Sequence, residues 1–156
     1  MAAGSAMTPP HDRKRPTRDR YGFALPLPTR WMDNDVYGHV NNVVYYAYFD
    51  TVINRYLIDR GGLDIAAGPV IGVCAESQCR YVAPSAYPEV LSGCLAVWRL
   101  GRSSVTYDLA IFAADGELRA FGHFVHVFVA RGDRRPVAIP DALRSALQIL
   151  VLDDRK

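Results

Sequence analysis

Two carboxylates, a glycine and a histidine gather in the short segment Asp33-Asn34-Asp35-Val36-Tyr37-Gly38-His39. The pattern that follows predicts a helix from about Asn42 to Arg60. The first-turn amides of a helix have no acceptor within it, and its dipole favours negative charge there. The segment could therefore hold a carbonyl oxygen that becomes an oxyanion, while an upstream carboxylate attacks that carbonyl or activates water. The alternative is structural: the aspartates order a turn, and Asn41 or Asn42 caps the helix.

The elements that must position this segment are visible in the spacing of apolar residues. The helix carries an apolar stripe with steps of four, three and four, formed by Tyr45, Phe49, Val52 and Tyr56. A proline-interrupted edge strand is predicted at 25–32, before the segment. Four more strands are predicted at about 70–82, 89–100, 104–113 and 118–130, and a short helix at about 140–152. One long helix with hairpin-linked strands predicts an antiparallel α+β fold.

Composition bounds the class of protein. The 156 residues suit one domain, and the net charge is +2. Five basic and two acidic residues fall within residues 1–20, so we interpret 1–22 as a disordered basic tail and 23–156 as a single domain. The nearly neutral remainder argues against nucleic-acid binding. No apolar run is long enough to cross a bilayer, and the first twenty residues contain no secretory signal. We therefore expect a cytoplasmic protein without a membrane partner.

The helix-entry segment also carries a recognisable motif. Residues 33–45 read Asp-x-Asp-x-x-Gly-His-Val-Asn-Asn-x-x-Tyr, and Tyr48-Phe49-Asp50 follows. This pattern resembles the active-site segment of the hot-dog-fold acyl-CoA thioesterases of the 4-hydroxybenzoyl-CoA thioesterase family, in the branch with a Gly-His-Val-Asn-Asn loop. Weaker matches at 80–84, 101–104 and 125–129 extend the resemblance over about 25–139. It implies a curved antiparallel sheet around one long helix, assembled as a homodimer or homotetramer with acyl sites at subunit interfaces.

The resemblance also implies roles for individual residues. The catalytic carboxylate of the family matches Asp35, and the glycine close to the thioester matches Gly38. Backbone amides from Gly38 to Val40 would polarise the carbonyl, and His39 falls at a position that lines the site. The substrate would contact residues that lead into the helix, namely Val40, Asn41, Asn42 and Tyr45.

The activity that the resemblance implies is hydrolysis of an acyl-CoA or acyl-carrier-protein thioester. No separate cofactor is expected, because coenzyme A is part of the substrate. The loop of plant acyl-carrier-protein thioesterases reads Asp-x-Asn-x-His, and here Tyr37 replaces its asparagine. Two alternatives are a non-catalytic protein that binds acyl thioesters and a dehydratase, whose histidine and carboxylate would be arranged differently.

The remaining chemically capable residues favour structural roles. His123 and His126 are three apart on a predicted strand, so they point to opposite faces and cannot share a metal. A catalytic zinc normally has three protein ligands, and we predict no metal site. We interpret all three cysteines as small buried residues, with Cys74 and Cys79 on opposite faces of one strand. The 118–130 strand is apolar on both faces, and we expect one face on the helix and the other against a second subunit.

Overall fold

The computed structural model describes residues 14–153. Its sheet contains five strands, β1 (Phe23–Pro28), β2 (Val70–Tyr81), β3 (Val90–Leu100), β4 (Ser104–Phe112) and β5 (Leu118–Ala130). Two α-helices accompany them, α1 (Val44–Asp59) and α2 (Asp141–Ile149), and short 3-10 helices occur at Arg18–Arg20 and Trp31–Asp33. Within this described part, no helix is both long and apolar enough to span a membrane.

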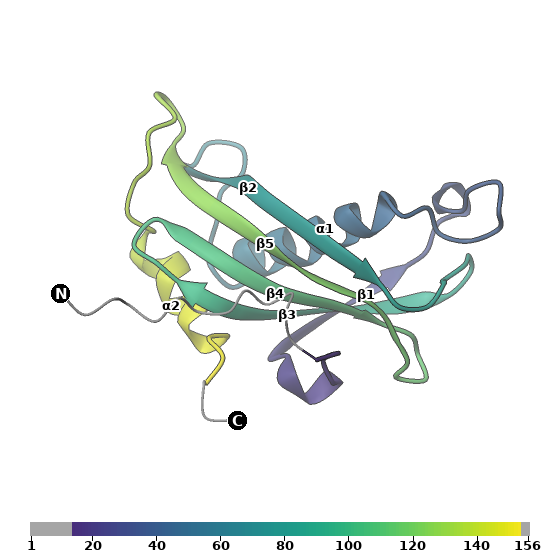
Figure 1. The fold of residues 1–156 in the computed structure, drawn as a ribbon. Helices are drawn as coiled ribbons and strands as arrows, with labels where there is room; N and C mark the ends of the chain where they lie inside the picture. Colours follow the sequence, from purple (N-terminus) through teal and green to yellow (C-terminus); the bar gives the residue numbers. More distant parts are fainter. Residues whose placement is uncertain (1–13, 154–156) are drawn as a thin grey trace.

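The strands form one antiparallel sheet in the order β1-β3-β4-β5-β2. Figure 1 shows α1 running along one face of the curved sheet, with α2 near the lower left end of the sheet. The predicted α+β architecture, an antiparallel sheet packed on one long helix, is confirmed. The prediction of an edge strand also holds, because among residues 14–153 β1 pairs only with β3, and an edge tolerates Pro26.

The buried face of α1 follows from its sequence. The helix buries Tyr45, Tyr48, Phe49, Val52, Ile53, Tyr56 and Leu57 against the sheet. These positions recur at helical spacing, so the predicted stripe is confirmed. The predicted helices were too long: α1 begins at Val44 rather than Asn42, and α2 ends at Ile149 rather than Leu152. The first strand ends at Pro28, and Trp31–Asp33 forms a 3-10 turn instead of continuing it.

A β-bulge in β2 changes which side chains face α1. The register passes from Cys74 opposite His126 to Glu76 opposite Val125, which leaves Ala75 as the extra residue. Cys74 and Cys79 therefore pair with His126 and Gly122, which lie four apart on β5 and share one face. The prediction that the two thiols lie on opposite faces was wrong. The prediction that all cysteines are buried holds only for Cys94, since Cys74 is exposed and Cys79 is intermediate.

The second face of β5 is covered in part by the chain itself. Tyr21 packs in a small apolar cluster that includes Phe121, and its hydroxyl donates to Asp108 Oδ1 at 2.9 Å. Arg20 Nη2 forms an ion pair with Asp108 Oδ2 at 2.7 Å. Ordered structure therefore starts before the predicted boundary at residue 23. Residues 1–13 of the predicted tail, like residues 154–156, lie outside the described residues.

The close approach of β5 to β2 makes Gly122→Ala strongly destabilising. A Cβ at Gly122 would collide with the Gln78 carbonyl oxygen and would lie 2.9 Å from its carbonyl carbon. The obstacle is backbone of the neighbouring strand, so we expect the free energy of unfolding to fall by about 3 kcal/mol. Urea denaturation measures this. The control is Gly132→Ala, where a Cβ would meet nothing within 4 Å. Equal stability of the two variants would contradict the packing argument.

Candidate active site

The loop before α1 is closed by its own backbone. An isolated bridge joins Asn34 and Val40, and the Asp35 amide donates to the His39 carbonyl at 2.9 Å. The Gly38 amide donates to the Asp35 carbonyl at 3.1 Å, and Gly38 has a φ of 84°. That left-handed conformation is strained for residues with a side chain. The loop thus has a defined shape that brings Asp35 and His39 together.

The two carboxylates of the Asp-x-Asp pattern occupy different environments. Asp33 is only 1% exposed and accepts hydrogen bonds from the Arg30 amide at 2.8 Å, Arg30 Nε at 3.0 Å and Tyr48 Oη at 2.7 Å. Burial by itself raises the pKa of the Asp33 carboxyl, but the hydrogen bonds from Tyr48 and Arg30 outweigh it, so the pKa is lowered. Asp33 ties the loop to α1 through Tyr48.

The Asp35 carboxylate is available for chemistry. Its Oδ1 accepts one hydrogen bond, from the Tyr37 amide at 2.9 Å, and the residue is only partly buried. Among residues 14–153 no ion pair engages it. Within these described residues its other oxygen has no hydrogen-bond donor, so it could meet a ligand at the loop surface.

The amides at the helix entry are only partly free. The Gly38 amide is bonded to Asp35, and the Val40 amide donates to the Ser85 carbonyl at 2.7 Å. The prediction that Asn41 or Asn42 is the N-cap was wrong, because Val43 precedes the first residue of α1 and no side chain caps the helix. Asn41 instead closes the turn before α1: its Oδ1 accepts from the Val43 amide at 3.2 Å, and its carbonyl accepts from the Val44 amide at 2.9 Å. In the described part of the chain, the His39 and Asn42 amides have no acceptor. Of the three amides predicted to polarise a carbonyl, His39 is the one that remains unengaged.

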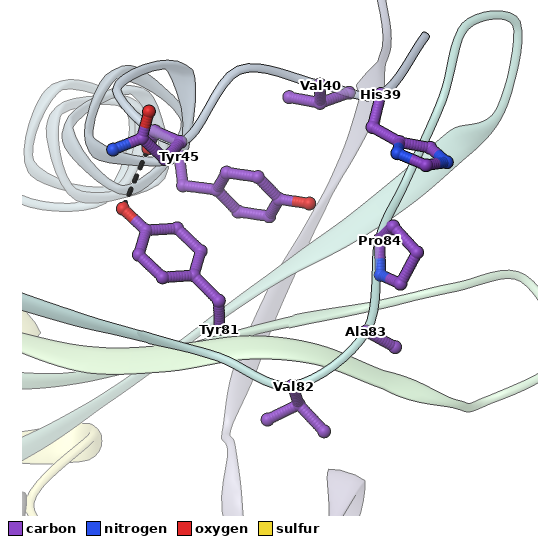
Figure 2. Close-up of a pocket in the computed structure, with 8 residues that line it drawn as sticks. His39, Val40, Tyr45, Tyr81, Val82, Ala83 and Pro84 are labelled. Atoms are coloured by element: carbon purple, nitrogen blue, oxygen red, sulfur yellow. Dashed lines mark hydrogen bonds between the residues drawn. The ribbon is translucent and has the colours of Figure 1, made fainter. Parts of the chain in front are cut away.

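A pocket of about 280 Å³ lies beside this loop, at the end of β2 (Figure 2). Its lining is His39, Val40, Asn42, Tyr45, Tyr81, Val82, Ala83 and Pro84. Tyr81 Oη donates to the Asn42 carbonyl at 2.8 Å, and the Tyr81 ring meets the Tyr45 ring edge to face at 5.3 Å. The pocket is thus a cleft between the helix entry and the segment that leaves β2.

The pocket brings together some of the predicted site residues. His39, Val40, Asn42 and Tyr45 line it, whereas Asp35, Gly38 and Asn41 do not. Asp35 is nevertheless held to His39 by the backbone bond described above. Tyr81 and residues 82–84 also line the pocket, and no site role was predicted for them from the sequence. Residues 80–84 were only one of the weaker matches to the family. Spacing offers no signal for a contact between residues 39 positions apart, such as Tyr81 and Asn42.

The strand histidines stand apart from this pocket. His123 Nε2 lies 2.6 Å from Glu76 Oε1. His126 lies opposite Cys74 in the register of β2 and β5, so these two side chains are on the same face of the sheet. Burial lowers the pKa of His126 to about 4, although the Asp50 carboxylate opposes the shift. Within residues 14–153, no three His, Cys, Asp or Glu side chains are grouped so that they could hold a metal ion.

Comparisons with known proteins concern the family and the fold of the chain. A model of the thioesterase-like superfamily matches residues 29–147. The PA5185 protein from Pseudomonas aeruginosa strain PAO1 is 55% identical, with 90% of this chain and 99% of that chain covered and a TM-score of 0.87. None of the curated proteins matches the chain.

Two more distant structures are also similar. A thioesterase from Thermus thermophilus, solved in a complex with coenzyme A and zinc, is 26% identical, with 82% and 98% of the two chains covered and a TM-score of 0.70. Slr0204 from Synechocystis, a 1,4-dihydroxy-2-naphthoyl-CoA thioesterase, is 19% identical, with coverage of 82% and 96% and a TM-score of 0.74. That last likeness concerns the fold alone, and together the neighbours confirm the predicted hot-dog fold.

Proposed function

The chain belongs to the thioesterase-like superfamily, and from this premise we propose that it hydrolyses an acyl-CoA to the free acid and coenzyme A. The observation that carries the proposal is the Asp35 carboxylate, which no ion pair engages within the described residues and which lies on a loop shared with the pocket-lining His39. The sequence pattern at 33–45 further supports the branch of the family with a Gly-His-Val-Asn-Asn loop.

The proposed reaction uses Asp35 against the thioester carbon. In one route Asp35 removes a proton from water, whose oxygen adds to the carbonyl carbon; the C–S bond then breaks and the thiolate takes up a proton. In the other route an Asp35 oxygen adds to the carbonyl carbon, the C–S bond breaks, and coenzyme A leaves as a thiolate that takes up a proton; water then hydrolyses the acyl–Asp35 anhydride to the free acid and the Asp35 carboxylate. In both routes the His39 amide and the entry of α1 stabilise the oxyanion. Oxygen-18 appearing in Asp35 after a single turnover in labelled water identifies direct attack.

The substrate positions follow from the pocket. Val40 and Tyr45 supply an apolar wall for the acyl group, while His39 and Asn42 supply polar groups near the thioester. The similar Thermus thermophilus thioesterase was solved with coenzyme A, which favours a coenzyme A ester over a carrier-protein ester. A thiol-release assay over short, long and aromatic acyl-CoAs, with acyl-carrier-protein esters in parallel, tests this choice. Turnover confined to the carrier-protein esters would reverse it.

A second candidate is a protein that binds acyl thioesters without hydrolysing them. It is favoured by the amides of Gly38 and Val40, which already have acceptors, and by the absence of Asp35 from the pocket lining. This candidate expects saturable binding of acyl-CoA with no thiol release. Isothermal titration alongside the thiol-release assay separates it from the enzyme.

We further propose that the chain forms a homodimer through the edge strand β2. Residues 73–77 of β2 are all exposed, and in the part of the chain that the structure describes β2 pairs only with β5. A long exposed edge is a site for pairing with another strand. The loop before α1 adds exposed apolar side chains, because Val36 is 94% and Tyr37 84% exposed.

The dimer proposal predicts that Val73→Lys yields a monomer, because a charge at the exposed edge opposes strand pairing. Light scattering coupled to gel filtration measures the mass of each form. We expect twice the chain mass for the wild type and for an Asp133→Ser control on an exposed loop. A monomeric wild type would contradict the proposal.

A further inference from the structure

A second hollow lies at the far end of α1 from the candidate active site. It has a volume of about 420 Å³ and is bordered by the start of β1, the end of α1 and one side of α2. Arg60, which follows α1, is 15 residues beyond Tyr45, and this corresponds to about 22 Å along a helix. The hollow is therefore separate from the pocket that His39 and Tyr45 line.

The walls of this hollow are mostly apolar and firmly placed. Phe23 packs edge to face on Tyr56 at 4.9 Å, and Tyr56 Oη donates to the Ala146 carbonyl at 2.6 Å. These two contacts join β1, α1 and α2 around the hollow. On α2, Ala142 and Ile149 lie seven residues apart on one side of the helix, and both line the hollow. Ile149 is 79% exposed, so a large aliphatic side chain borders an open apolar space.

The hollow has one charged group, and that group is a cation. Arg60 lines it, and within residues 14–153 its guanidinium forms no ion pair. The adjacent carboxylate, Asp59, is held instead by Arg55 Nη2 at 2.7 Å. Ser145 adds a hydroxyl donor, and none of the lining residues is acidic. The charge of the hollow thus fits an anion rather than a cation.

We propose that this hollow binds an aliphatic monocarboxylate, with its tail against Phe23 and Ile149 and its carboxylate on Arg60. An arginine fork matches a carboxylate with two parallel hydrogen bonds, and an apolar cleft of this size suits a small amphiphile. The free acid released from an aliphatic acyl-CoA would belong to this class, but binding here requires no hydrolysis. The structure thus assigns the chain a second ligand site, remote from the candidate active site.

The test is a titration of the full chain with decanoate, followed by the NMR signal of the Ile149 δ1 methyl group. We expect a saturable shift of this signal. Arg60→Gln weakens binding about tenfold, the usual scale for losing a charge-assisted hydrogen bond. Decanol has the same tail and no charge, and we expect the wild type to bind it as weakly as Arg60→Gln binds decanoate. Ala142→Trp fills the hollow from an exposed helix position and abolishes the shift, whereas Arg135→Gln, on an 86% exposed loop arginine, changes nothing.

Three results would overturn the proposal. The first is no saturable shift of the Ile149 methyl signal with decanoate. The second is equal affinity for decanoate in the wild type and in Arg60→Gln. The third is a shift that depends on protein concentration without decanoate, because it would place a second copy of the chain in the hollow.

Discussion

Asp35→Asn is expected to reduce thiol release from acyl-CoA by about 10²–10⁴-fold, the range for losing a general base. The amide keeps the size of the side chain and can still accept from the Tyr37 amide, so the loop keeps its shape. It can neither remove a proton from water nor attack a carbonyl. Steady-state kinetics should place the loss in kcat, with KM changed little, because Val40 and Tyr45 rather than Asp35 line the pocket.

The matched control for this prediction is Asp59→Asn. Asp59 is an exposed carboxylate at the far end of α1, paired with Arg55, and it lies outside the candidate site. We expect its rate of thiol release to equal that of the wild type. If Asp35→Asn also kept the wild-type rate, Asp35 would not be the catalytic group. If the wild type bound acyl-CoA and released no thiol, the binding protein described above would be the better interpretation.

The positions of α1 and of the strands could be predicted because burial imposes a period on each. Phe49 and Val52 are fully buried, as the 3.6-residue stripe predicts. The start of the helix could not be placed to the residue. Both the side chain and the carbonyl of Asn41 satisfy amides at the entry, so the turn through 41–43 replaces the first helical turn that was predicted.

Other features depend on contacts that a local pattern does not record. The bulge at Ala75 adds one residue to β2, so counting odd and even positions from Cys74 to Cys79 gives the wrong face. The wall that Tyr81 forms in the pocket exists because β2 ends beside the start of α1. Chain topology decides that contact, and no spacing within either segment encodes it.

The candidate site was located by residue type and resemblance, but the different environments of its two carboxylates could be seen only in the structure. Asp33 and Asp35 are two residues apart and chemically identical in the sequence. Their contacts distinguish them, because Asp33 is buried and accepts from Tyr48 and Arg30, whereas Asp35 is only partly buried. The assignment of Asp35 as the catalytic carboxylate, which the resemblance implied, is compatible with this difference and stays a prediction until the kinetics are measured.

Asp33→Ala should lower the free energy of unfolding by about 3 kcal/mol at neutral pH, because the donors of Tyr48 and Arg30 lose a buried charged acceptor. The ion pair with Arg30 adds little, since the Arg30 side chain is 64% exposed. Urea denaturation measures the difference. The control Asp59→Ala removes an exposed partner of Arg55 and should change stability by less than about 1 kcal/mol.

The same network makes the effect of Asp33→Ala depend on pH in a defined direction. The pKa of Asp33 is lower in the folded chain than in the unfolded chain, so the folded state holds the carboxylate deprotonated. Its contribution is fully present above the unfolded pKa of about 3.9 and is lost as pH falls through the lower folded value. The stability gap between wild type and Asp33→Ala should therefore be constant near neutral pH and narrow below about pH 4. A gap that widened in acid would mean that burial, rather than the hydrogen bonds from Tyr48 and Arg30, controls the Asp33 carboxyl.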